Sequence, residues 1–247
     1  MSYITIPSFD ISAYRNEAIA EGVAGIYNPC KTILNEHRPV CTKEYHLTGK
    51  YLDGADNPDV WFPIPGVGGG TVVYDTRFLT LTSGTGETSA TRCVIDQTKF
   101  PITGNFIEAT VSIGASGNGE GGADRRIVFG FQPSFSQTFG GGADRAIFAK
   151  NGAGIWTVRT KTDTVSLSDL PLGRNVLPGD ICTVRLGRQE GSADIDIVRF
   201  YVNGHKQFES TGVPTADCYA GIGAFGVEAL TTGISISIDY FGVRYVP

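Results

Sequence analysis

The sequence predicts an all-β protein in which two antiparallel sheets pack face to face. The last third of the chain consists of short segments rich in β-branched and aromatic residues, each closed by Gly, Pro, Asn or Asp. Glycine is abundant, with 33 residues, and only 18% of the 247 residues are charged, which is typical of a turn-rich sandwich. Residues 12–22 alone have a composition that favours a helix, with Ser12 as its N-cap and Gly22 at its end.

We divide the chain into an N-terminal arm, residues 1–45, which we expect to dock on a partner, and a sandwich domain, residues 46–247. No helical pattern interrupts the strands of the second part, which indicates two packed antiparallel sheets. The expected strands are Glu44–Thr48, Thr71–Asp75, Phe78–Thr82, Ala90–Ile95, Phe106–Ile113, Arg126–Gln132, Arg145–Lys150, Gly154–Thr160, Ile181–Arg188, Asp194–Val202, His205–Ser210, Ala220–Val227 and Ile234–Tyr245.

Alternation of residue type assigns the buried faces of two of these strands. The residues expected in the core are Ile107, Ala109, Val111 and Ile113 in one strand, and Ile234, Ile236 and Ile238 in the last. Asn203 and Gly204 predict a type I′ hairpin turn, because both central positions of that turn need a positive φ.

The five cysteines are widely spaced and form no C-x-x-C pair, so a zinc site is poorly supported. We expect reduced thiols that pack as small apolar side chains. Cys30 and Cys41 flank a short loop and form the one plausible local disulfide.

Charge and hydropathy exclude two classes of partner. A net charge of −5 argues against a nucleic-acid binder, which needs a positive field. The sequence has no apolar run near the roughly 20 residues that span a bilayer, so no membrane partner is expected. The N-terminus lacks the charged and apolar regions of a secretory signal, and we expect synthesis in a cytoplasm without export by the usual route.

The motif Gly-Gly-Ala-Asp-Arg occurs twice, at residues 121–125 and 141–145, each time before an apolar strand. In one interpretation these are equivalent turns, in which Asp124 and Asp144 bind loop backbone while Arg125 and Arg145 extend along the strand start. In the other, the two Asp and Arg pairs form a rim that binds a sugar or a neighbouring subunit.

Two further groups of residues are candidates for binding a metal ion or a sugar. Acidic and amide oxygens gather in residues 53–59, where turn formation and Ca²⁺ binding both remain open. The candidate Ca²⁺ ligands are Asp53, Asp56, Asn57 and Asp59. Trp61, Trp156 and Tyr219 could stack on a sugar ring, although the sequences around the two tryptophans are also typical of core edges.

Residues from roughly 50 to 247 resemble the concanavalin A-like lectin and glucanase jelly roll. The segments that carry the resemblance are Trp61–Phe62, Gly68–Tyr74, Phe78–Thr85, Phe106–Ile113, Val198–Gly204 and Ile238–Tyr245. The resemblance implies a jelly-roll sandwich and leaves function open, because this scaffold hosts lectins, glycosidases, adhesion modules and virion proteins.

The glucanase branch of that superfamily carries Glu-x-Asp-x-x-Glu on one strand, for hydrolysis by paired carboxylates. The nearest match here is Asp194, Asp196 and Arg199, with Arg in place of the third carboxylate, and Glu108 stands alone on its strand. The three histidines form no recognisable nucleophile motif. We therefore expect no enzyme and no cofactor other than the Ca²⁺ considered above.

Jelly rolls of this type mostly work outside cells, yet the chain has no export signal. Virion proteins resolve this conflict, because they are made in the host cytoplasm and leave with the particle. We predict a non-enzymatic phage or viral structural protein, such as a capsid decoration or a head or tail fibre component. Its partners would be capsid or tail proteins and further copies of itself, and its loops at roughly 114–125 and 136–145 would contact host glycans or neighbouring subunits. The alternatives are a secreted or surface carbohydrate-binding module and a divergent glycoside hydrolase.

Overall fold

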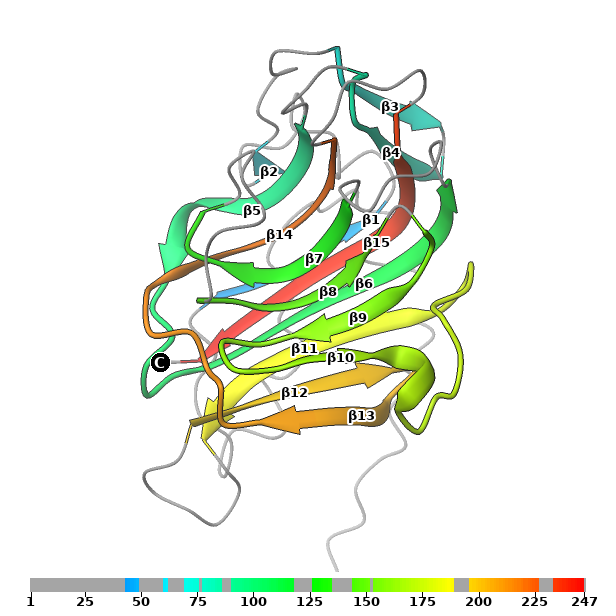
Figure 1. The fold of residues 1–247 in the computed structure, drawn as a ribbon. Coiled ribbons are helices and arrows are strands. Elements are labelled where there is room, and N and C mark those ends of the chain that lie inside the picture. Colours follow the sequence, from blue (N-terminus) through cyan, green and yellow to red (C-terminus); the bar gives the residue numbers. More distant parts are fainter. Residues whose placement is uncertain are drawn as a thin grey trace, which may run out of the picture.

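Two antiparallel sheets pack face to face in the computed structural model, as the sequence predicts (Figure 1). The structure describes residues 43–48, 60–61, 69–75, 77–85, 90–117, 126–134, 144–151, 153–188, 196–226 and 233–246. Within these ranges the helical structure is one 3₁₀ turn, η3 (Leu167–Asp169). The described part of the chain has no helix of the length and apolar character needed to cross a membrane.

The first sheet has eight strands in the described part of the chain. In spatial order they are β13 (His205–Ser210), β12 (Asp196–Val202), β11 (Ile181–Arg188), β6 (Phe106–Gly117), β15 (Ser235–Val246), β4 (Phe78–Thr82) and β3 (Thr71–Asp75), with β1 (Lys43–Thr48) beside β15. The long strand β15 pairs with β4 along its first half and with β1 along its second.

The second sheet has seven strands among the described residues. In spatial order they are β10 (Thr164–Ser166), β9 (Trp156–Arg159), β8 (Ala146–Lys150), β7 (Arg126–Gln132), β14 (Cys218–Phe225), β5 (Ala90–Phe100) and β2 (Val60–Trp61). Neighbouring strands of this sheet are antiparallel throughout.

Most predicted strand boundaries agree with the structure to within two residues. The strands β5 and β6 run several residues further than expected, and β2, β10 and η3 were not predicted because they are too short to display a period. Residues 43–45, assigned to the arm, belong to β1 and pair with β15. The expected helix at 12–22 and the rest of the arm lie outside the described residues.

The core lies between the sheets and is joined across the gap by aromatic pairs. The rings of Phe148 on β8 and Phe200 on β12 meet edge to face with centroids 5.2 Å apart. Phe129 on β7 and Phe241 on β15 do the same at 5.9 Å. Such pairs add to the free energy gained by burying apolar surface. All seven residues that alternation assigns to the core are buried.

The three cysteines in the described ranges, Cys93, Cys182 and Cys218, are free and buried. Burial raises the pKa of each of these thiols, because a thiolate is poorly solvated in the core. They pack as small apolar side chains, as expected. Cys30 and Cys41 lie outside the described residues.

Candidate functional site

The hairpin turn between β12 and β13 forms one side of a surface groove. Asn203 and Gly204 have φ angles of 52° and 78°, which confirms the predicted type I′ turn. The Asn203 side chain accepts a hydrogen bond from the backbone N of Ile181 at 2.9 Å and donates one to Asp180 at 2.8 Å. The turn is therefore fixed to the start of β11.

Asp180 fixes the neighbouring loop to the same turn. Its carboxylate accepts two hydrogen bonds from the guanidinium of Arg174, at 2.6 and 2.9 Å, and one from the backbone N of Leu177 at 2.8 Å. Burial acts to raise the pKa of Asp180, but the hydrogen bonds from Arg174, Leu177 and Asn203 outweigh it and hold that pKa below its ordinary value. The carboxylate therefore stays ionised and keeps the loop in place.

A β-bulge at Gln207 attaches a second part of the loop. Phe200 pairs with Phe208 and Tyr201 with Lys206, which leaves Gln207 as the extra residue of β13. The buried Gln207 side chain accepts a hydrogen bond from the backbone N of Leu172 at 2.7 Å and donates one to the His205 carbonyl at 2.9 Å. The bulge thus directs the Gln207 amide towards the loop, whereas a regular strand would point this side chain in another direction.

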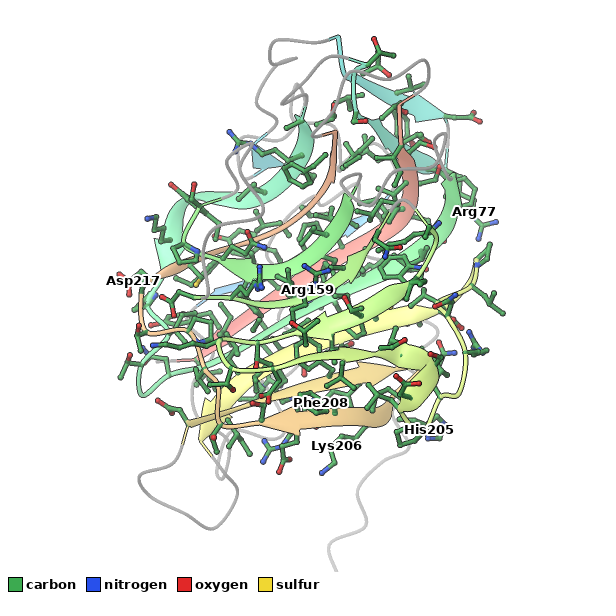
Figure 2. All side chains as sticks on the ribbon, viewed as in Figure 1. Arg77, Arg159, His205, Lys206, Phe208 and Asp217 are labelled. Carbon is green, nitrogen blue, oxygen red and sulfur yellow. The ribbon has the colours of Figure 1, made fainter. Side chains whose placement is uncertain are left out.

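These contacts frame an open groove of about 590 Å³, within the size range of small-ligand sites. Its lining residues are Pro171, Leu172, Arg174, Val202, Asn203, His205, Lys206 and Gln207. Pro171 and Leu172 supply accessible apolar surface above the buried Val202, while His205 and Lys206 are exposed at the rim, at the lower edge of the molecule in Figure 2. The groove therefore combines an apolar floor with imidazole, amide and ammonium groups.

Asp144 and Arg145, which the sequence offered as part of a ligand-binding rim, lie apart from this groove's lining. The Asp144 carboxylate accepts hydrogen bonds from the backbone N of Thr215 at 2.7 Å and of Ala216 at 2.9 Å. This geometry fits the interpretation in which Asp binds loop backbone. Arg145 is half-buried immediately before β8.

Trp156, the third described candidate, is only 1% exposed and packs in the core between the sheets. Its ring therefore has no free face for stacking on a sugar. Tyr219, also considered for stacking, is half-buried on β14, with the Lys99 ammonium 5.5 Å from its ring centroid. The side chain of Trp61 lies outside the described part of the structure, as do Asp124 and Arg125 of the first repeat, and Asp53, Asp56, Asn57 and Asp59 of the Ca²⁺ hypothesis. Among the residues that are described, no three His, Cys, Asp or Glu side chains gather to hold a metal ion.

Comparison with known proteins identifies the fold. No protein-family model matches the sequence, and no curated protein matches it. A protein of unknown function from Shewanella oneidensis MR-1 superposes with a TM-score of 0.60 at 14% identity, covering 98% of this chain and 97% of that one. Lectin II from Ulex europaeus superposes with a TM-score of 0.50 at 11% identity, covering 84% of this chain and 100% of the lectin. The fold is a concanavalin A-like jelly roll.

An endo-1,3-β-glucanase from Streptomyces sioyaensis is also similar, with a TM-score of 0.48 at 13% identity over 76% of this chain and 90% of the enzyme. These identities are low, so the likeness concerns the architecture of the jelly roll alone.

The carboxylates of this jelly roll that invite comparison with glucanases each have their own partner. Asp196 accepts a hydrogen bond from the backbone N of Gly104 at 3.2 Å. Arg199, in the position of the third glucanase carboxylate, binds Glu209 at 2.8 Å. Glu108 accepts a hydrogen bond from Arg185 at 2.7 Å. Asp194 lies outside the described residues.

The sequence indicated the hairpin beside the groove but not the groove itself. His205 reads as a solvated turn residue in the sequence, and it does follow the turn directly. Leu172 and Gln207 carry no local motif, because their contact joins segments thirty-five residues apart. Arg174 binds Asp180 six residues later, within a loop that has no repeating pattern. The Asn203-Gly204 turn was the one local signal that pointed to this end of the jelly roll.

Proposed function

We propose that this chain is a non-catalytic, lectin-like module that binds a glycan in the groove beside the β12–β13 turn. The observation that carries the proposal is an apolar floor next to exposed polar side chains in one open groove. A pyranose has a matching character, with C–H faces and a ring of hydroxyls. Leu172 and Pro171 would contact the C–H face, and His205 and Lys206 would bind hydroxyls.

The hydrogen bonds that hold the turn and the loop around the groove favour binding without rearrangement. The side chains of Asn203, Gln207 and Asp180 already hold the turn and the loop through hydrogen bonds. A preformed site avoids part of the entropy cost of ordering loops on binding. Because the groove is open and few groups reach the ligand, we expect a dissociation constant of about 0.1 mM for one sugar unit.

The absence of catalysis is the second half of the proposal. A glycoside hydrolase needs two carboxyl groups about 5–10 Å apart across the scissile bond. Asp196, Glu108 and Glu209 are each engaged by a different partner, two of them in ion pairs. A carboxylate that already binds a cationic side chain is poorly placed to donate a proton as a general acid, so the ion pairs of Glu108 and Glu209 support a binding role.

A glycan array followed by calorimetry tests binding. The variant His205→Ala/Lys206→Ala should lose at least about tenfold in affinity, which corresponds to 1.4 kcal/mol. The matched control is Arg77→Ala, an exposed cation directly before β4 that lies well above His205 and Lys206 in Figure 2. The proposal fails if the wild-type chain binds no glycan or if the double variant binds as tightly as the control.

Incubation with polysaccharides tests the absence of catalysis. We expect no new reducing ends from β-glucans under conditions in which binding is detected. Release of oligosaccharides that persists after repurification would identify an enzyme and would contradict this part of the proposal.

A place in a virion, with capsid or tail proteins as partners, stays a prediction from the sequence. A glycan-binding module on a particle surface would be compatible with it. Mass spectrometry of purified particles tests the location, and deletion of residues 1–42, which leaves β1 intact, tests the docking arm. Unchanged incorporation of the truncated chain would remove the arm from the account.

A further inference from the structure

The titratable side chains that line the groove beside the β12–β13 turn are all basic. Arg174, His205 and Lys206 are among the lining residues, and none of the described residues that line the groove is Asp or Glu. The chain as a whole has the opposite balance, with 25 acidic residues against 20 Lys and Arg. The groove is therefore a basic site on an acidic protein, and such a site attracts anionic ligands.

The acidic residues that bind these cations leave positive charge at the groove. Asp180 binds Arg174, but the side chain of Asp180 is only 7% exposed, whereas that of Arg174 is 37% exposed. Glu209 lies 3.2 Å from Lys206 and 2.8 Å from Arg199. Because Glu209 is one carboxylate between two cations, this group of side chains keeps an excess of positive charge.

The acceptor oxygens of the two amide side chains in the lining are already engaged. The Oδ1 atom of Asn203 accepts a hydrogen bond from the backbone N of Ile181 at 2.9 Å. The Oε1 atom of Gln207 accepts one from the backbone N of Leu172 at 2.7 Å. A neutral sugar presents hydroxyls, which donate as well as accept, and a donating hydroxyl finds few side-chain acceptors in this lining.

Donors, by contrast, remain on the guanidinium of Arg174. Its Nη1 donates to Asp180 at 2.6 Å and to the Asn175 carbonyl at 2.8 Å, and its Nη2 donates to Asp180 at 2.9 Å. Within the described part of the chain, these bonds leave the N–H of Nε and the second N–H of Nη2 for a ligand. Together they form one edge of the guanidinium, and such an edge donates two parallel hydrogen bonds to an anionic group.

We propose that the glycan bound in this groove is acidic, and that Arg174 and Lys206 bind its carboxylate or sulfate ester. The inference rests on the proposed function and names the class of glycan that the groove selects. An anionic group only accepts hydrogen bonds, so it matches a site that is rich in donors. His205 then binds a neighbouring hydroxyl, because a neutral imidazole both donates and accepts.

Matched pairs of oligosaccharides test this selection. Each pair consists of an oligosaccharide with uronic acids or sulfate esters and the same oligosaccharide after its carboxylates are reduced to alcohols or its sulfates are removed. Calorimetry should show that the acidic member binds at least about tenfold more tightly. Equal affinity within the pairs, or binding confined to neutral glycans, would overturn this inference and leave the proposed function intact. Binding of no glycan, acidic or neutral, would contradict both.

Variants of Lys206 test whether the groove makes the selection. Lys206→Gln removes the charge at similar length and should weaken binding of the acidic member about fivefold, and of the neutral member by less. Lys206→Arg, which restores the charge, should recover most of that loss. The matched control is Arg77→Gln, which removes an exposed cation directly before β4 and should bind both members like the wild type. Equal losses in Lys206→Gln and Arg77→Gln would mean that the overall charge of the chain selects the ligand, and would also overturn the inference.

Discussion

Asp180 joins the loop before β11 to the β12–β13 turn, through hydrogen bonds from Arg174, Leu177 and Asn203. Replacement by Asn keeps one acceptor oxygen and removes the charge. We predict that Asp180→Asn lowers the free energy of unfolding by about 2 to 3 kcal/mol, because buried donors lose a charged acceptor. Urea denaturation measures this change.

Glu209→Gln is the control for Asp180→Asn. Glu209 also binds two cations, but its side chain and that of Lys206 are well exposed to water. Solvent screening should therefore hold the loss to within about 1 kcal/mol. Equal losses in the two variants would mean that the hydrogen bonds of Asp180 contribute no more than a surface ion pair.

At the scale of elements, Gly130 permits the close approach of β7 and β8. Its φ is +137°, and a Cβ atom at this position would collide with the carbonyl oxygen of Ala146. We predict that Gly130→Ala costs about 3 kcal/mol or more in the free energy of unfolding, from backbone strain together with overpacking.

A second glycine separates these two contributions. Gly173 also has a positive φ, +63°, but a Cβ atom there would meet nothing within 4 Å. Gly173→Ala should therefore cost only about 1 kcal/mol, the penalty of the left-handed conformation. If Gly130→Ala and Gly173→Ala lose the same free energy of unfolding, the contact with Ala146 is not the reason that β7 requires glycine.

The elements that the sequence predicted well are those with a repeating local pattern. Alternation located β6 and β15 and their buried faces, because one face of each strand packs against the core. Asn203 and Gly204 located the hairpin turn, because few residues adopt a positive φ. The short strands β2 and β10 offer too few residues for a period to appear.

The groove could not be predicted in the same way. The bulge at Gln207 is stabilised by a hydrogen bond from Leu172, thirty-five residues earlier in the chain. Asp180 and Arg174 meet within a loop that has no regular structure apart from its turns, so no repeating pattern in the sequence indicates their contact. The sequence left Trp156 open between a sugar contact and the edge of the core, because an aromatic residue next to turn formers can lie in either place, and here it is buried in the core.

At the scale of the whole molecule, several carboxylates link stability to pH. The pKa of Asp180 is below its ordinary value, as described above. Hydrogen bonds, chiefly from Ser210 to Asp163 and from Arg199 to Glu209, also lower the pKa of these two groups. A carboxyl group whose pKa is lowered by folding stabilises the protein above its unfolded pKa, and that contribution is lost as the pH falls through the folded pKa.

We therefore predict that the free energy of unfolding is level near neutral pH and declines once the pH falls below about 4. Urea denaturation at a series of pH values measures the decline. Asp180→Asn should show a shallower decline than the wild type, since one of the contributing groups is gone. A decline of equal steepness in both proteins would remove Asp180 from this account.

Asp163 also connects the two sheets, because it follows β9 and accepts a hydrogen bond from Ser210 at the end of β13. With the aromatic pairs of the core, this contact ties both layers into one body. We expect the jelly roll to unfold in a single cooperative step, with no stage at which one sheet persists alone.

The protein contains an internal reporter of that cooperative unfolding, namely its buried cysteines Cys93, Cys182 and Cys218. Their thiols are buried and poorly ionised, so an alkylating reagent reaches them only when the sandwich opens. Mass spectrometry should find these three sites labelled together, at a rate that rises steeply with urea. Rapid labelling of one of these cysteines without urea would show that the sheet covering it unfolds locally.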